Sequence, residues 1–132
     1  MTSDDTALLE AAKAVRLRAH APYSHYFVGA AVLDEKGRVH SGCNVENAAY
    51  PEGICAETSA IAAMVAAGGK RIVAIAAVGG HGTVAACTPC GGCRQRIREF
   101  ADRNTRIVLL DEHGKPRRYT IEELLPASFH LP

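Results

Sequence analysis

The hydrophobic positions near the start of the chain repeat every three or four residues. They lie between a capping segment at residues 2–4 and Pro22 and comprise Leu8, Leu9, Ala12 and Val15. This spacing predicts an amphipathic first helix, which we expect to end at Pro22. Residues 26–33 and 39–45 are rich in strand-forming side chains and are separated by a Glu-Lys-Gly turn, so they predict an antiparallel hairpin.

Helical and extended patterns alternate along the rest of the chain. We expect a helix at 55–67, a strand at 72–78, a helix at 90–100, strands at 106–110 and 117–120, and a short helix at 121–125. Helices between successive strands are typical of crossover connections, so the pattern predicts a layered α/β domain with a mixed sheet. No repeat or linker divides the sequence, and residues 1–132 are interpreted as a single domain.

Composition and charge narrow the class of partner. The 132 residues are 48% hydrophobic and carry a formal charge of +1, which gives no strong field toward nucleic acid or membrane. We therefore expect a small neutral ligand, no nucleic-acid partner and no membrane association. Charged residues interrupt the first twenty positions, which argues against a signal peptide. Five cysteines are an odd number, which argues against a framework of disulfide bonds. A cytoplasmic protein with thiolate chemistry is expected.

The candidate chemistry lies in two cysteine segments, each at a predicted helix start. Cys55 opens the first, and Cys90 and Cys93 form a C-x2-C pair in the second. Three thiolates can hold one Zn²⁺ and leave a fourth tetrahedral position open, as a catalytic zinc requires. Helix N-termini favour thiolate over thiol and partly offset the three negative sulfurs. Glu57, two residues after Cys55, is predicted to carry protons beside the metal.

Two other interpretations of the cysteines remain open at this stage. Cys87 or Cys43 could be a fourth ligand and close the site, in which case the zinc would only hold the fold. Cys87, Cys90 and Cys93 also form the start of an iron–sulfur run, which the following Arg-Gln-Arg-Ile leaves incomplete. Outside these roles, Cys43 and Cys87 are interpreted as small buried hydrophobic residues.

Cys-Ala-Glu followed by Pro-Cys-Gly-Gly-Cys is the signature of zinc deaminases, and the chain resembles the short-chain cytidine deaminase family over nearly its whole length. Residues 22–31, 42–50 and 124–129 also resemble segments of that family. The resemblance implies a three-layer α/β/α domain with a mostly five-stranded mixed sheet. It also implies one zinc per subunit and a homotetramer whose active sites take residues from neighbouring subunits.

The resemblance also assigns residues to the substrate. Asn44 and Glu46 would bind the ribose hydroxyl, and Tyr26 would stack on the pyrimidine. The backbone near Ala56 would orient the amino group, with Cys55, Cys90 and Cys93 as zinc ligands and Glu57 as the catalytic residue. Tyr50 and Phe129 would close a neighbour's site, although aromatic residues are equally common in cores and interfaces.

The chain departs from the family at two positions. Tyr26 stands where the family commonly has Phe, and its hydroxyl needs a partner. Thr58 follows the catalytic glutamate where many members have an arginine whose charge relieves the three thiolates. A threonine hydroxyl can donate one hydrogen bond to sulfur but brings no charge. We expect Arg94 to compensate.

The function implied is hydrolytic deamination of cytidine or deoxycytidine to uridine or deoxyuridine plus ammonia, in pyrimidine salvage. Water adds at C4 of the ring while Glu57 moves its proton to N3 and then to the leaving amine. Alternatives are a deaminase of a nucleoside antibiotic of the blasticidin type and a non-catalytic zinc-stabilised module. A nucleic-acid editor is disfavoured because no aromatic residues alternate with Arg94, Arg98 and Arg103.

Overall fold

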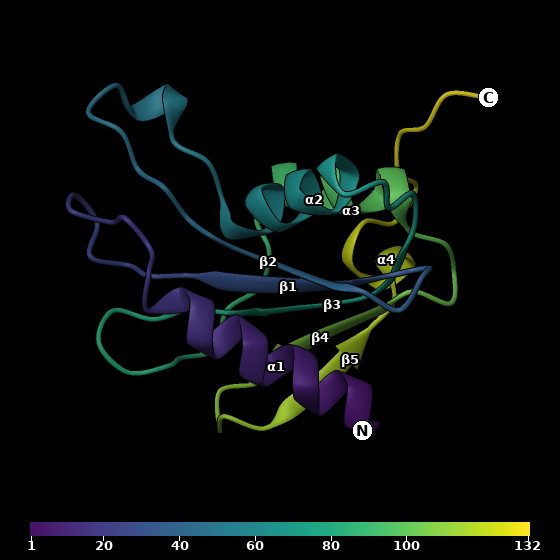
Figure 1. Ribbon diagram of the computed structural model, residues 1–132, viewed down its shortest axis with the longest axis horizontal. Helices are drawn as coiled ribbons and strands as arrows, with labels where there is room; N and C mark the ends of the chain where they lie inside the picture. Colours follow the sequence, from purple (N-terminus) through teal and green to yellow (C-terminus); the bar gives the residue numbers. More distant parts are fainter.

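The computed structural model describes residues 1–132 as an α/β domain (Figure 1). Its helices and strands follow in the order α1 (Ser3–Arg16), β1 (Gly29–Asp34), β2 (Val39–Cys43), the 3-10 helix η1 (Tyr50–Glu52), α2 (Ala56–Ala66), β3 (Ile72–Val78), α3 (Gly91–Phe100), β4 (Arg106–Leu110), β5 (Pro116–Tyr119) and α4 (Ile121–Leu124). Each helix and strand predicted from the sequence is present, and η1 is the element that the pattern did not indicate.

The five strands form one mixed sheet in the order β2-β1-β3-β4-β5. Strand β1 pairs antiparallel with both β2 and β3, and β4 pairs antiparallel with β5. The single parallel pair is β3 and β4, which α3 connects as a crossover. The predicted hairpin and the predicted mixed sheet are confirmed.

Helices cover both faces of the sheet, which makes three layers (Figure 1). Side chains alternate across each strand, so neighbouring residues enter different cores. In β4, Ile107 and Leu109 pack under α2, α3 and α4, whereas Val108 and Leu110 pack under α1. The three-layer α/β/α architecture expected from the resemblance is confirmed.

The first helix ends earlier than predicted. It stops at Arg16 rather than at Pro22. The chain beyond it is extended at His20, whose backbone N–H donates to the Asn44 carbonyl at 3.0 Å and whose carbonyl accepts from Glu46 N–H at 2.8 Å. These bonds connect the segment after α1 to the segment after β2, so the helix cannot continue to the proline.

The hairpin strands are also shorter than predicted at their site end. Strand β1 begins at Gly29 instead of Tyr26, and β2 ends at Cys43 instead of Val45. The Asn44 side chain explains part of the difference, because its Oδ1 accepts from Val28 N–H and its Nδ2 donates to the Tyr26 carbonyl, both at 2.8 Å. Short polar side chains of this kind compete with strand pairing for backbone groups.

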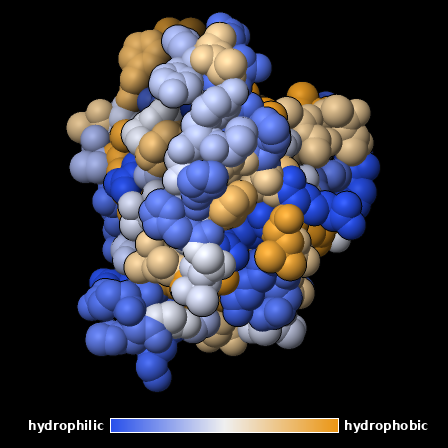
Figure 2. Space-filling view, turned by 90° about the vertical axis from the view of Figure 1, so that its left-hand side faces the viewer, coloured by the Kyte–Doolittle hydropathy of each residue, from blue (hydrophilic) through white to orange (hydrophobic).

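No helix has both the length and the apolar composition needed to cross a bilayer. Hydrophobic residues on the face shown in Figure 2 occur in small groups separated by hydrophilic ones.

Candidate metal centre and active site

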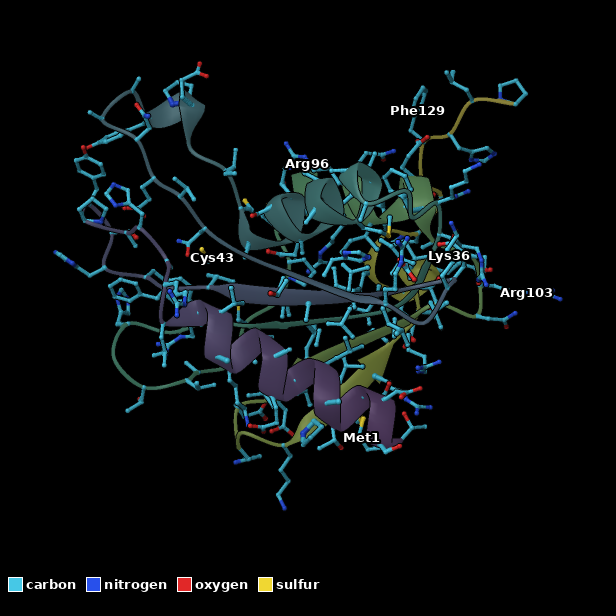
Figure 3. All side chains as sticks on the ribbon, viewed as in Figure 1. Met1, Lys36, Cys43, Arg96, Arg103 and Phe129 are labelled. Carbon is cyan, nitrogen blue, oxygen red and sulfur yellow. The ribbon has the colours of Figure 1, made fainter.

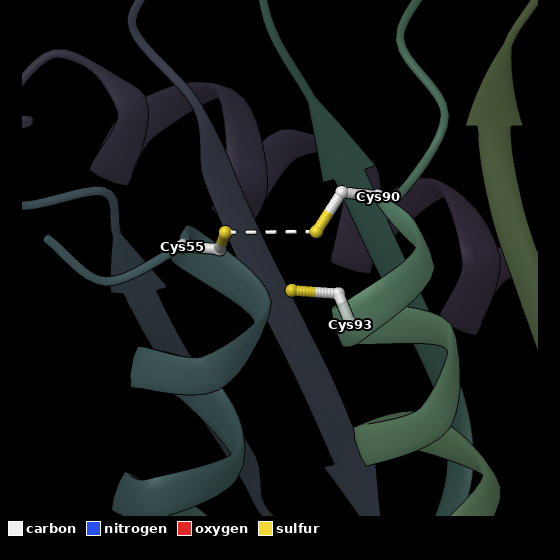
Figure 4. A group of neighbouring side chains, drawn as sticks. All are labelled: Cys55, Cys90 and Cys93. Carbon is white, nitrogen blue, oxygen red and sulfur yellow. Dashed lines mark hydrogen bonds between the residues drawn. The ribbon is translucent and has the colours of Figure 1, made fainter. Parts of the chain in front are cut away.

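Two helix N-termini bring the three predicted cysteine ligands together. Cys55 is the N-cap of α2, Cys90 is the N-cap of α3, and Cys93 lies in the first turn of α3. Their sulfur atoms all lie within 4.8 Å of one another, and the Cys55 and Cys90 sulfurs are 3.8 Å apart (Figure 4). Zn–S bonds of about 2.3 Å at tetrahedral angles require sulfurs about 3.8 Å apart, so the set fits zinc.

The surroundings of the sulfurs also fit a cation. A hydrogen bond with Cys55 and burial raise the pKa of the Cys93 thiol, and a hydrogen bond with Cys93 lowers the pKa of the Cys55 thiol. Thiolates this close repel one another, and a cation between them relieves that repulsion. The Thr58 hydroxyl lies 3.7 Å from the Cys93 sulfur, where it can donate the hydrogen bond expected from the sequence.

The metal set contains three sulfurs and no fourth protein ligand. Cys43 and Cys87 lie outside it. The closed structural site and the iron–sulfur alternative both needed Cys87 or a further cysteine among the ligands, and the geometry supports neither. Cys87 is half-buried and lines the adjoining cavity instead, where burial raises the pKa of its thiol.

Glu57 lies beside the three sulfurs in the first turn of α2. Its side chain lines the cavity although the residue is only 4% exposed. Burial raises the pKa of its carboxyl above the ordinary value, while its own backbone N–H and the charge of Arg96 oppose this shift. A buried carboxylate with a raised pKa exchanges protons more readily near neutral pH than an exposed one.

A cavity of about 350 Å³ opens in front of the sulfurs. Eight of the ten residues assigned from the sequence line it: Tyr26, Asn44, Glu46, Tyr50, Cys55, Ala56, Glu57 and Cys90. Its charged lining residues are Glu46 and Glu57, and no lysine or arginine contributes to the wall. A larger cavity of about 610 Å³ beside α3 and α4 contains none of these residues.

The predicted ribose ligands are engaged with the protein itself. The Glu46 carboxylate accepts hydrogen bonds from the backbone N–H groups of Tyr23 and Ser24, at 2.9 and 3.1 Å, and from the Ser24 hydroxyl. These bonds lower the pKa of Glu46 and hold it ionised. Asn44 holds the Tyr26 and Val28 backbone as described above. Neither residue lies within a strand, so their shared orientation comes from these bonds rather than from strand alternation.

The three predicted aromatic residues occupy different places. Tyr26 lines the cavity, and burial together with its hydrogen bond to Cys87 raises the pKa of its hydroxyl to about 12, so Cys87 is the partner that this hydroxyl needed. Tyr50 lies at the mouth, 75% exposed and edge-on to Tyr23 at 5.7 Å between centroids. Phe129 is 68% exposed on the C-terminal segment and does not line its own chain's cavity (Figure 3).

Arg94 does not approach the sulfurs, contrary to expectation. Its Nε donates to the Pro89 carbonyl at 2.8 Å and its Nη1 to the Leu124 carbonyl at 2.9 Å. The arginine that reaches the site is Arg96, whose Nη1 lies 3.8 Å from the Cys93 sulfur. Its position three residues after Cys93 on a helix was the signal in the sequence, since residues three apart share a helix face.

The chain matches known families and structures over most of its length. The family described as the cytidine and deoxycytidylate deaminase zinc-binding region matches residues 2–110. A cytidine deaminase of Mycobacterium tuberculosis is 44% identical over 113 residues, covering 86% of this chain and 80% of that protein. A cytidine deaminase of Sporosarcina psychrophila is 38% identical over 126 residues, covering 96% and 91%. The crystal structure of cytidine deaminase from Burkholderia pseudomallei superposes with a TM-score of 0.86 at 44% identity, covering 98% of this chain and 100% of that one.

Proposed function

Since this chain belongs to the cytidine and deoxycytidylate deaminase family of zinc-dependent hydrolases, we propose that it converts cytidine and deoxycytidine to uridine and deoxyuridine with release of ammonia. The observation that carries the proposal is the juxtaposition of three metal-binding sulfurs, the Glu57 carboxylate and a cavity of about 350 Å³. Cavities of this size are typical of small-molecule sites. The corresponding role is pyrimidine salvage.

Cys55, Cys90 and Cys93 hold the zinc in this proposal. Zinc bound by three protein ligands makes hydroxide available as a nucleophile at neutral pH. Glu57 takes one proton from the attacking water and delivers it to N3 as the new C4–O bond forms. Glu57 then carries the second water proton to the amino nitrogen, the C4–N bond breaks, and ammonia leaves with the carboxylate ionised again. The backbone beside Ala56, at the cavity wall, orients the amino group.

The charge of the cavity supports a nucleoside rather than a nucleotide. A phosphate group would face two carboxylates, Glu46 and Glu57, and no cationic side chain of this chain. Glu46 contacts the ribose hydroxyl through lone pairs that its three donors leave free. Asn44 retains one amide hydrogen and one lone pair for the same hydroxyl, and Tyr26 packs against the pyrimidine.

Exposed aromatic side chains support a homotetramer with shared active sites. Tyr50 and Phe129 expose most of their surface, and Tyr23 exposes about half. Large exposed aromatic side chains are enriched at protein interfaces. Phe129, outside its own cavity, closes the site of a neighbouring subunit in this assembly, and Tyr50 contributes at the mouth. All five cysteines are unpaired, as suits the reducing cytoplasm.

The test is ultraviolet monitoring of the purified zinc-loaded protein with cytidine, deoxycytidine, cytosine, CMP and blasticidin S. We expect turnover of the first two and little with CMP, because its phosphate meets carboxylates. Turnover of blasticidin S alone would reject cytidine as the substrate. Glu57→Gln is the matched control and should lose turnover while it keeps its zinc. A Glu57→Gln variant that keeps both turnover and zinc would show that Glu57 has no catalytic role.

A further inference from the structure

The proposed zinc centre has an unbalanced charge. Three thiolates around a divalent cation give a net charge of −1, and the ionised Glu57 adds to it. A charged group near such a centre stabilises the metal-bound form more than the metal-free form, in which thiols are partly protonated. Thr58, beside Cys93, contributes a hydroxyl dipole only.

Arg96 is positioned to supply the missing charge. Its guanidinium Nη1 lies within 3.8 Å of the Cys93 sulfur, reaching back along α3 from the following turn. The side chain is exposed and lies on the outer side of the layer formed by α2 and α3 (Figure 3). The hydrogen bond to the Cys93 sulfur is the polar contact that holds the guanidinium at the centre.

Gly92 makes room for this conformation. A Cβ atom at Gly92 would lie 3.0 Å from Arg96 Nη1 and 4.0 Å from the Cys90 sulfur. A methyl group at this position would crowd the guanidinium and push it away by a few tenths of an ångström. Since the φ of Gly92 is not in the left-handed region, backbone strain does not require a glycine there. The space itself is what the glycine provides.

We propose that Arg96 is a positioning residue that balances the charge of the three-cysteine zinc centre, and that Gly92 leaves the space its guanidinium needs. The inference rests on the proposed zinc site but not on the identity of the substrate. It also replaces Arg94 in this role, because the Arg94 guanidinium is committed to the Pro89 and Leu124 carbonyls.

The test measures zinc transfer from the loaded protein to a chromogenic chelator in the absence of any substrate. We expect zinc release from Arg96→Gln to be about fivefold faster than from the wild type, the upper range for a partly exposed charge pair. Arg96→Lys keeps the charge and should recover part of the effect. Arg103→Gln removes the same charge from an exposed position elsewhere (Figure 3) and should release zinc at the wild-type rate.

Release from Arg96→Gln at the wild-type rate would overturn the proposal, as would equal acceleration by Arg103→Gln. A lysine variant as fast as the glutamine variant would overturn the assignment to charge. Because cytidine is not used, these outcomes are independent of whether cytidine is the substrate.

A second variant tests the role of Gly92. Gly92 lies in the first turn of α3 and its φ is not left-handed, so Gly92→Ala should fold. Its methyl group crowds the guanidinium at 3.0 Å and should accelerate zinc release in the wild-type background but not in Arg96→Gln. Equal acceleration in both backgrounds would mean that Gly92 acts on the sulfurs directly, and would refute the pairing.

Discussion

Replacing Asn44 with alanine tests whether the segment before β1 depends on one side chain. The Asn44 amide makes two hydrogen bonds of 2.8 Å, one from Val28 N–H and one to the Tyr26 carbonyl. Each contributes about 1 kcal/mol, so Asn44→Ala should lower the free energy of unfolding by ~2 kcal/mol. For a chain of this length the unfolding entropy converts that loss to a fall of about 7 °C in Tm.

Thermal and urea unfolding followed by circular dichroism measure this loss. Asn47→Ala is the matched control, because the Asn47 side chain accepts one bond at an exposed site, from Ala49 N–H at 2.9 Å. Its Tm should change little. Asn44→Ala should also lower kcat/KM, since Tyr26 in the cavity wall is released. Unchanged stability together with a raised KM would refute the reasoning and show that Asn44 serves the substrate alone.

Two other buried groups give further predictions. Arg16→Met should destabilise the protein by ~3 kcal/mol, because the Arg16 guanidinium donates to the carbonyls of Phe27, Gly80 and Gly82 at 2.9–3.0 Å; an unchanged urea midpoint would contradict this. Burial raises the pKa of Glu57 above its ordinary value of 4.5. Below the ordinary pKa the carboxyl is protonated in both the folded and the unfolded state and costs no stability. As pH rises through the raised pKa, the buried carboxyl must ionise and the free energy of unfolding falls. Metal-free Glu57→Gln should therefore be more stable than metal-free wild type at about pH 7 and equal to it at about pH 3, and an equal difference at both would be inconsistent with burial.

The fold could be predicted largely because strand and helix periods are strong signals. The apolar runs at Ile72–Val78 and Arg106–Leu110 were identified with their bounds unchanged. The errors lie where side chains bind backbone. Asn44 ends two strands early by taking their backbone partners, and the pairing of His20 with the segment after β2 ends α1 before Pro22. Such long-range bonds leave no periodic pattern.

The convergence of the three cysteines could be predicted because spacing at two helix starts restricts where sulfurs can lie. The convergence of Cys55 with Cys90 and Cys93 confirms that geometry. Arg94 was expected near the sulfurs, although the three-residue spacing of Cys93 and Arg96 on one helix already favoured Arg96. Arg94 turns toward α4, and Arg96 turns back to Cys93. Thr88 and Ile54 also line the cavity, but their positions depend on how the loops pack, and no local sequence pattern predicts them.

The most direct test is a crystal structure of the loaded protein with data collected across the zinc absorption edge. The account predicts one anomalous peak at about 2.3 Å from the sulfurs of Cys55, Cys90 and Cys93, with no fourth protein ligand and with the Glu57 carboxylate facing the open side. A zinc ion with the Cys87 sulfur as its fourth ligand, or a Glu57 side chain turned away from the metal, would contradict it.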